Sequence, residues 1–311
     1  MIYNWVMKNK YSKALPTGTI DETKITPGVI LLQGGSSRGV FTCGVLDCLM
    51  QNDINIKDAI GVSAESLNGF NYLAGKIGRA ARIPFEFVNN PKYIGPIAYL
   101  KNKGLFGFDF IFHGKPYKKY PISFDDVLSK DRELIVATTD INEGKAAYYK
   151  LSEFDGDFYD VIQASSSIGL IAKQVSIHGH DHLDGGYSAS VPINKALELG
   201  YKKIVVVLTM PLDINKFPLK EYHVTKSIAK KYKDYPNFLK TFDENNITSK
   251  KSFETMMELN EKKEIFVIAP NKQLDVTVAT FGKKKLSAAY WQGYNLAKEL
   301  IPQLKEYLEI N

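Results

Sequence analysis

Ser63 is the first residue of this sequence whose type and position indicate chemistry. It lies in the run GVSA at residues 61–64, between an apolar stretch that predicts a strand and a stretch that predicts a helix. A serine on such a turn is held clear of the sheet, and the first amides of the helix favour a developing negative charge. The usual pattern is G-x-S-x-G, but Glu65 stands at the last glycine position. The alternative is that Ser63 only caps the helix.

A glycine-rich loop, GGSSRG at residues 34–39, is the second candidate. Glycines allow several N–H groups to point at one place, which is what an oxyanion requires. Two phosphate-binding motifs fail on spacing. A Walker loop requires Lys where Val40 stands, and the dinucleotide fingerprint requires Gly where Ser36 stands. Taken alone, the loop is equally typical of a plain strand-to-helix turn.

Asp184 is the third candidate, because it ends a predicted strand and is followed directly by Gly185 and Gly186. An aspartate before two glycines is also a common turn, so this motif is weak by itself. Its weight comes from its place in the order of the three motifs along the chain.

The elements that must position these residues form a repeating pattern. Residues 28–32 predict a strand buried on both faces, followed by a glycine turn and a helix at 40–51. Residues 56–62 predict a second strand, followed by a turn and a helix at 63–76. This repeat predicts a parallel sheet with crossover helices. Further strands are predicted at 134–138, 204–208 and 265–268, a helix at 157–167, a hairpin at 175–184, and helices within 222–261 and at the C-terminus, where Pro302 predicts a kink or break. We therefore expect an N-terminal extension (1–26) and a single three-layer α/β/α domain (27–311) with a mainly parallel central sheet.

The three motifs, in this order, resemble those of the patatin-like phospholipases. The separation of 121 residues between Ser63 and Asp184 suits that family. Residues 38–47, 78–82, 90–93 and 105–110, and the part from about residue 264, are similar to a bacterial branch of predicted patatin-family esterases. The likeness covers nearly everything after residue 27.

The resemblance implies hydrolysis of carboxylic esters of lipids, without a cofactor. Ser63 would attack the ester carbonyl, and Asp184 would take its proton directly and later return one to the leaving alcohol, with no histidine between them. The implied oxyanion donors are the backbone amides of Gly35, Ser36 and Ser37, together with Arg38. The residues that support the motifs are Gly34, Gly39, Gly61, Gly185 and Gly186.

Two positions depart from the family pattern. Ser36 replaces the third glycine of the loop, and Glu65 replaces the glycine two residues after the nucleophile. We expect Glu65 to place a bulky anion near the catalytic centre, where it could crowd the turn, repel an anionic substrate, raise the proton affinity of Asp184 or mark a lost activity. The alternatives are therefore an impaired relative that binds lipid or protein, and a soluble small-ester hydrolase or acyltransferase with no membrane role.

The net charge and the composition favour some classes of binding partner over others. The chain has 40 basic and 34 acidic residues, and this mild excess favours acidic partners such as anionic membrane surfaces. Residues 101–120 interleave lysine with Phe and Tyr, which suits contact with lipid headgroups, the entrance to a site or an ordinary covering segment. No nucleic-acid-binding module is recognisable. The oligomeric state stays open.

The N-terminus lacks the apolar core of a signal peptide, and no apolar run reaches transmembrane length. Cys43 and Cys48 form no disulfide framework, so we expect a cytoplasmic protein whose membrane contact, if any, is peripheral. His178, His180 and His182 have the composition of a metal site, but Gly179 predicts a hairpin turn among them, and we expect no metal.

Overall fold

The computed structural model describes residues 11–102, 104, 106–169, 171–219, 221–277, 280 and 282–310. Among these residues, eight strands form one sheet in the order β10-β9-β2-β3-β5-β8-β7, with β6 paired to β5. The strands are β2 (Ile25–Leu32), β3 (Asn55–Val62), β5 (Leu134–Asp140), β6 (Lys145–Lys150), β7 (Val175–Ile177), β8 (His180–Asp184), β9 (Ile204–Val207) and β10 (Phe266–Ile268). The five strands from β10 to β5 are parallel, whereas β6 and β8 pair antiparallel with β5. The predicted, mainly parallel sheet is confirmed.

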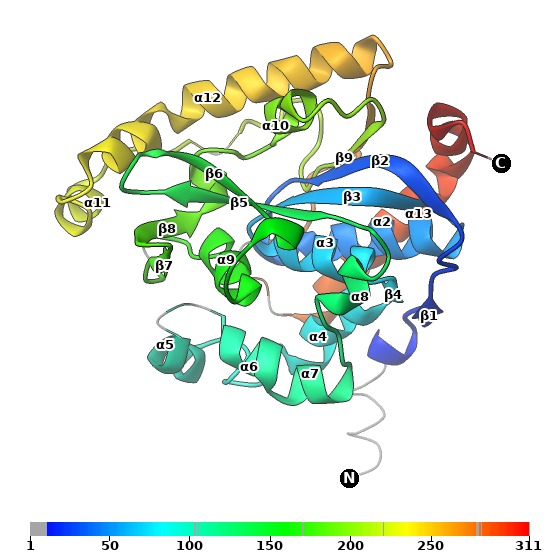
Figure 1. Cartoon of the computed structure of the whole chain (residues 1–311), viewed down its shortest axis with the longest axis horizontal. Helices are drawn as coiled ribbons and strands as arrows, with labels where there is room; N and C mark the ends of the chain where they lie inside the picture. The colour runs from blue at the N-terminus through cyan, green and yellow to red at the C-terminus, as the bar shows by residue number, and fades with distance from the viewer. Residues whose placement is uncertain are drawn as a thin grey trace.

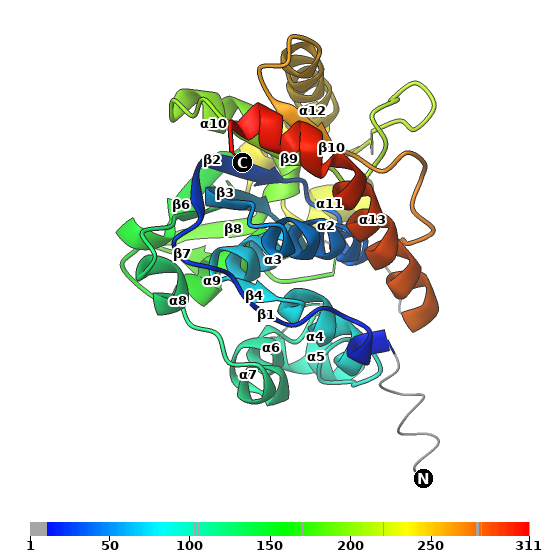
Figure 2. The ribbon, with the colours of Figure 1, turned by 90° about the vertical axis from the view of Figure 1, so that its right-hand side faces the viewer.

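Helices cover both faces of this sheet (Figures 1 and 2). The α-helices are α2 (Gly39–Gln51), α3 (Ala64–Leu73), α4 (Arg79–Phe87), α5 (Pro96–Asn102), α6 (Phe108–His113), α7 (Lys115–Lys119), α8 (Asp125–Leu128), α9 (Phe158–Ser165), α10 (Ile193–Glu198), α11 (Lys226–Lys231), α12 (Pro236–Glu261) and α13 (Lys283–Leu308). Three short 3₁₀ turns are η1 (Ser36–Arg38), η2 (Leu151–Glu153) and η3 (Gly185–Tyr187). In Figure 1, α10 and α12 lie above the sheet and α2, α3 and α13 below it, which is the expected three-layer arrangement.

Strand β2 shows why the apolar runs form the centre of the fold. Ile30 and Leu32 belong to the core cluster on the side of α2 and α3, whereas Val29 and Leu31 belong to the cluster that includes residues of α10 and α12. Successive side chains of a strand point to opposite faces, so a run that is apolar throughout is buried only where both faces are covered.

Helix α2 is buried along almost its whole length between the sheet and α13. The two helices approach closely at glycines, because a Cβ on Gly44 would lie 2.0 Å from the Tyr290 carbonyl oxygen. Likewise, a Cβ on Gly293 would lie 2.1 Å from the Phe41 carbonyl oxygen. The C-terminal helix is thus part of the core that holds α2, and Cys43 and Cys48 on α2 are free thiols buried there.

The N-terminal segment differs from the expected extension. Its residues 1–10 lie outside the described residues, but Leu15 and Ile20 are buried in the main core. Arg82 donates to the carbonyls of Leu15 and Pro16, at 3.1 and 2.7 Å. A strand pair, β1 (Gly18–Thr19) with β4 (Lys76–Ile77), joins the segment to the domain. Two apolar residues five positions apart, Leu15 and Ile20, do not form a periodic pattern, so the sequence did not predict this packing.

Several helix boundaries also differ from the predictions. Helix α3 ends at Leu73 rather than near residue 76, before Gly75, whose φ of +70° suits the end of a helix. Pro302 does not interrupt α13, which continues to Leu308 because the buried Leu304 and Leu308 still pack against the core. The region 222–261 is divided into α11 and α12, and α12 begins at Pro236, a favoured first position.

Candidate active site

The turn at Ser63 has an unusual backbone conformation. Ser63 follows β3 directly, with φ 61° and ψ −135°, a region that residues other than glycine rarely adopt. Its amide donates to Ser165 Oγ at 2.8 Å, and its carbonyl accepts from the amide and the hydroxyl of Ser66 at 3.0 and 2.6 Å. Ser165 in turn donates to the Ala137 carbonyl on β5 at 2.6 Å. The conformation is therefore held from both sides of the turn.

Asp184 meets Ser63 at the end of β8. The Ser63 hydroxyl donates to Asp184 Oδ2 at 2.6 Å, and both residues are buried. Asp184 Oδ1 accepts from the Gly186 amide at 2.8 Å, and the Asp184 amide donates to the Ser167 carbonyl at 2.9 Å. The Thr139 hydroxyl donates to the Asp184 carbonyl at 2.8 Å. These bonds orient the carboxylate toward the serine, and Gly185 and Gly186 make the tight turn η3 that supplies one of them.

The glycine loop lies against the same turn. It follows β2, the strand beside β3 in the parallel sheet, so both loops leave the same edge. A Cβ on Gly34 would lie 3.2 Å from Ser63 Cβ, which shows how closely the loop approaches the serine. Ser36 adopts φ 50°, so this serine occupies the left-handed conformation that the glycine of the family pattern would adopt more easily.

Arg38 does not match the expected donor role through its amide. That amide already donates to the Gly35 carbonyl at 3.0 Å inside η1, so it is committed to the turn itself. Its side chain lies beside the site, where burial lowers the pKa of the guanidinium and the nearby Tyr222 and Glu65 oppose that shift. Arg38 therefore offers a partly desolvated positive charge rather than a backbone donor.

Glu65 corrects the expectation of an anion beside the serine. Its carboxyl group lies between α2 and α3, where Oε2 accepts from Asn68 Nδ2 at 2.9 Å. A Cβ on Gly39 would lie 2.4 Å from Oε1, so the glycine provides the space that the carboxyl group occupies. Burial raises the pKa of Glu65 to about 8, opposed by Asn68, Thr42 and Arg38. At neutral pH it is predominantly an uncharged acid packed between two helices.

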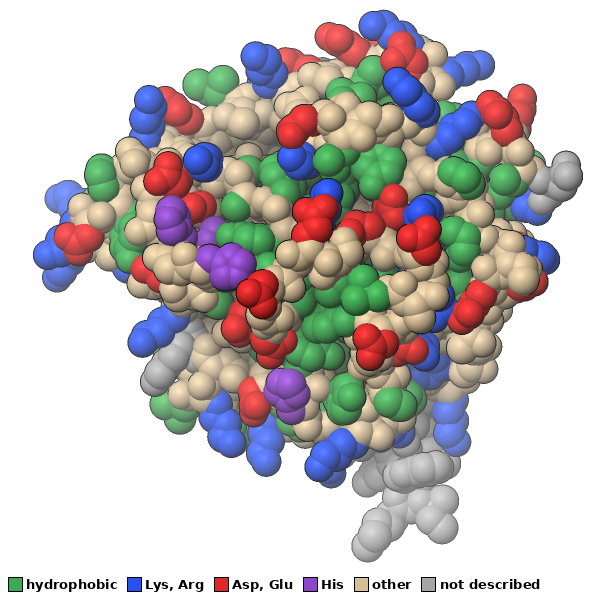
Figure 3. Space-filling model, viewed as in Figure 1, with side chains coloured by type: hydrophobic (Ala, Val, Ile, Leu, Met, Phe, Trp, Pro, Cys, Tyr) green, Lys and Arg blue, Asp and Glu red, His purple; other side chains and the backbone are tan. Residues whose placement is uncertain are grey.

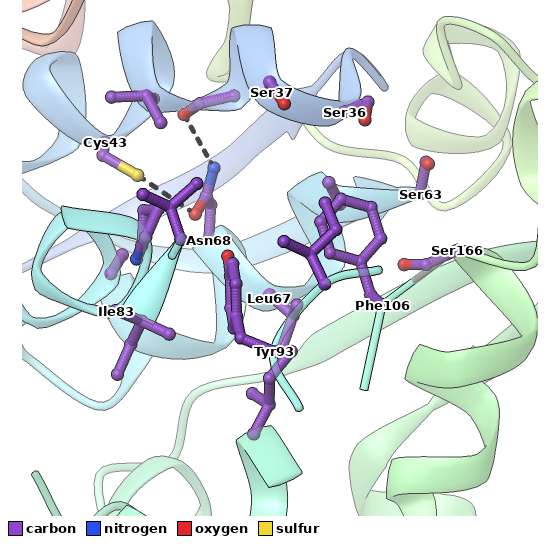
Figure 4. Close-up of a pocket in the computed structure, with 18 of the residues that line it drawn as sticks. Ser36, Ser37, Cys43, Ser63, Leu67, Asn68, Ile83, Tyr93, Phe106 and Ser166 are labelled. Carbon is purple, nitrogen blue, oxygen red and sulfur yellow. Dashed lines mark hydrogen bonds between the residues drawn. The ribbon is translucent and has the colours of Figure 1, made fainter. Parts of the chain in front are cut away.

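Two cavities meet at Ser63, and they differ in chemistry. Ser36, Ser63 and Ile168 line both. The first is largely apolar, and its walls include Leu67, Ile83, Tyr93, Ile94, Phe106 and Phe108. The second is more polar, and its walls include Gln33, Arg38, Asp184, Ser190, Tyr222 and Asn245. In Figure 4, Ser63 lies at one end of the apolar cavity with Ser166 and Phe106 beside it, and Cys43, Ile83 and Tyr93 line the part away from the serine.

A family model described as patatin-like phospholipase matches residues 30–197, more than half of the chain. The chain belongs to the patatin-like phospholipase family. A second model, a domain of unknown function (DUF6363), matches residues 235–309, from the start of α12 to the end of α13.

Two known proteins are similar to this patatin-like chain. The uncharacterized protein YjjU of Escherichia coli (strain K12) is 28% identical over 207 residues, which cover 62% of this chain and 55% of YjjU. The chain thus matches little more than half of the length of that relative. The crystal structure of VipD from Legionella pneumophila has a TM-score of 0.48 and 10% sequence identity, and the match covers 94% of this chain and 69% of VipD.

The remaining sequence candidates are placed as follows in the patatin-like domain. Gly61 lies within β3, two residues before the serine turn. The histidines point to separate partners: His182 lies between Thr138 and Tyr149, His180 pairs with Asp140, and His178 contacts the Asp155 carbonyl. No group of three or more His, Cys, Asp or Glu residues in the described ranges could hold a metal ion.

Sequence reasoning missed the serines that support the site. Ser165 fixes the amide of Ser63, and the Ser167 carbonyl fixes Asp184. Ser166 lines the apolar cavity, and its buried hydroxyl has no hydrogen-bond partner among the described residues. The run of three serines at 165–167, after a predicted helix, was the signal that could have identified them.

Proposed function

We propose that this protein hydrolyses carboxylic ester bonds of lipids through a dyad of Ser63 and Asp184. The observation that carries the proposal is the hydrogen bond of 2.6 Å from the Ser63 hydroxyl to Asp184 Oδ2, at the junction of two cavities. A base within hydrogen-bond reach is what activation of a serine hydroxyl requires.

The proposed reaction has two halves. Ser63 Oγ attacks the ester carbonyl carbon while its proton passes to Asp184 Oδ2, and the carbonyl oxygen becomes an oxyanion. When the tetrahedral intermediate collapses, the bond to the alcohol oxygen breaks and Asp184 returns the proton to that alcohol. Water then attacks the acyl-serine ester and gives a proton to Asp184. Asp184 passes this proton to Ser63 Oγ as the bond between Oγ and the acyl carbon breaks, so the acid is released and Ser63 is regenerated.

Stabilisation of the oxyanion is assigned to the glycine loop. The backbone amides of Gly35, Ser36 and Ser37 are the proposed donors, because the loop abuts Ser63 and the Arg38 amide is already used within η1. The buried Arg38 guanidinium adds a positive charge on the side of the polar cavity. The apolar cavity suits the acyl chain, and the polar cavity suits the alcohol and the attacking water.

The position of Glu65 favours a catalytically active enzyme over a catalytically impaired relative. The residue that departs from the family pattern is buried between α2 and α3 and lines neither cavity. It therefore leaves the hydrogen bond between Ser63 and Asp184 intact.

A fluorophosphonate probe tests the dyad directly. Intact-mass measurement with peptide mapping should find one adduct, on Ser63, and none in Ser63→Ala. Asp184→Asn should slow both labelling and hydrolysis of a soluble ester by a factor of about 10²–10⁴. Asp181→Asn, three residues earlier on the same strand, is the matched control and should label like the wild type. Labelling of a different serine, or Asp184→Asn that reacts at the wild-type rate in a folded protein, would contradict the dyad.

A further inference from the structure

One segment of the chain is rich in lysine and poor in acidic residues. Residues 91–120 contain six lysines and one acidic residue, Asp109, a net charge of +5. The lysines are Lys92, Lys101, Lys103, Lys115, Lys118 and Lys119. Of these, Lys119 is paired with Glu86. In Figure 3, lysine and arginine side chains gather along the lower edge of the molecule, where Figure 1 places α5, α6 and α7.

Exposed apolar side chains lie in the same place. On α5, Ile97, Tyr99 and Leu100 are 39%, 52% and 68% exposed. Ile171, on a neighbouring loop, is 39% exposed. This loop lies close to the residues that follow α5, because a Cβ on Gly104 would lie 3.5 Å from Ala172 Cβ. Four of the seven large apolar side chains exposed by the described residues thus lie here. We call the surface formed by Lys92, Ile97, Tyr99, Leu100, Lys101 and Ile171 the α5 face.

The α5 face is the outer side of a wall of the apolar cavity. The same segment turns Ile94, Phe106, Phe108 and Ile111 toward the cavity that ends at Ser63. A smaller hollow lies between Asn102 and Gly104 on one side and Ile171 and Ala172 on the other, and it shares Phe106, Phe108, Ser166 and Ile168 with that cavity. Apolar lining therefore continues from the exposed surface to the nucleophile.

We propose that the α5 face docks the protein on an anionic lipid surface, so that an acyl chain can pass from the lipid layer into the apolar cavity. This inference rests on the proposed lipid ester hydrolysis and names the surface through which the substrate would arrive. The exposed apolar residues enter the headgroup region while the lysines meet anionic headgroups. A lipid surface fits better than a protein partner, because the cores of protein interfaces are depleted in lysine.

Vesicle co-sedimentation of the full chain tests the docking. The vesicles are phosphatidylcholine alone, or phosphatidylcholine and phosphatidylglycerol in equal parts. The wild type should bind the anionic vesicles more strongly, and high salt should weaken this binding. The double variant Lys92→Gln/Lys101→Gln should lower the partition coefficient by about 30-fold, since each lysine near the surface contributes about fivefold. Leu100→Asp should lower it by about tenfold.

Matched controls come from α12, which Figure 1 shows at the opposite end of the molecule. Ile247 is 73% exposed there, and Lys251 and Lys262 are exposed lysines of the same region. Ile247→Asp and Lys251→Gln/Lys262→Gln should bind vesicles like the wild type. Ser63→Ala should also bind like the wild type, so docking is measured without catalysis.

The two proposals fail in different ways. If the wild type hydrolyses no ester but binds vesicles through the α5 face, the proposed function is wrong and the docking surface is retained. Equal binding to both kinds of vesicle, or α5 variants that behave like the α12 controls, would overturn the docking surface. So would size-exclusion chromatography that shows a dimer dissolved by Leu100→Asp, because the face would then bind a second copy. Hydrolysis of a soluble short-chain ester should be unchanged in the α5 variants.

Discussion

Replacement of Glu65 by glutamine should change how the stability of the protein depends on pH. The carboxyl group is completely buried between α2 and α3, and burial raises its pKa from the ordinary 4.5 to about 8. The folded protein therefore holds one proton more than the unfolded chain between these two pKa values. Because the folded-state pKa is the higher one, the stability that this group contributes is fully present below pH 4.5 and is lost as the pH rises toward 8.

The size of the effect follows from linkage. One proton taken up on folding changes the free energy of unfolding by about 1.4 kcal/mol per pH unit, so the wild type should lose about 3 kcal/mol between about pH 5 and pH 7 through this group. Glutamine does not titrate and has nearly the same shape. Burial also raises the pKa of Asp47, to about 7. Asp47 titrates in both proteins, so its contribution to the pH dependence cancels when the two are compared.

Urea unfolding followed by circular dichroism, at pH values from about 5 to 8, measures the difference. The stability of Glu65→Gln relative to the wild type should rise by about 3 kcal/mol over about two pH units. Any unfavourable contact of the glutamine amide adds a constant that does not vary with pH. A difference that stays constant across this range would refute the reasoning, because it would mean that Glu65 is already ionised in the folded protein. The variant should still label at Ser63, since Glu65 lines neither cavity.

Three further substitutions test packing and hydrogen bonds, two beside the serine turn and one between α2 and α13. Ser165→Ala removes the hydroxyl that holds the serine turn to β5, and it should lower the free energy of unfolding by about 1–3 kcal/mol in urea titration and slow probe labelling. Gly39→Ala should lower the free energy of unfolding by about 1–3 kcal/mol, because the added methyl group would clash with the Glu65 carboxyl group. The loss should be smaller in a Glu65→Ala background, where that carboxyl group is absent, and an equal loss in both backgrounds would refute the contact. Tyr290→Phe removes the hydroxyl that donates to buried Asp47 at 2.7 Å, and thermal unfolding should show a loss of about 1–3 kcal/mol at neutral pH.

None of the helices in the described part of the chain combines the length and the apolar character that a span needs. The lipid contact proposed for this family member is assigned to the α5 face, where exposed apolar residues and lysines coincide.

The parallel core and the motifs could be predicted from the sequence because they depend on local pattern. The apolar runs at 28–32 and 204–208 predict buried strands, and β2 and β9 form there. The segment 56–62 predicts a further strand, which β3 contains. The serine turn, the glycine loop and the aspartate were recognisable because each requires particular residue types at adjacent positions. The segment 77–130 and the packing of residues 11–26 showed no comparable pattern.

Only the tertiary structure decided how these parts meet and which groups are charged. Ser63 and Asp184 are far apart in the chain, and they meet because β5 lies beside β3 and pairs antiparallel with β8. The sequence placed a glutamate two residues after the serine, but the packing of α3 on α2, with the space left by Gly39, determined where its carboxyl group lies. Residue type sets which protons a side chain can exchange, whereas burial and neighbours, which only the folded chain creates, set the pH at which it does so.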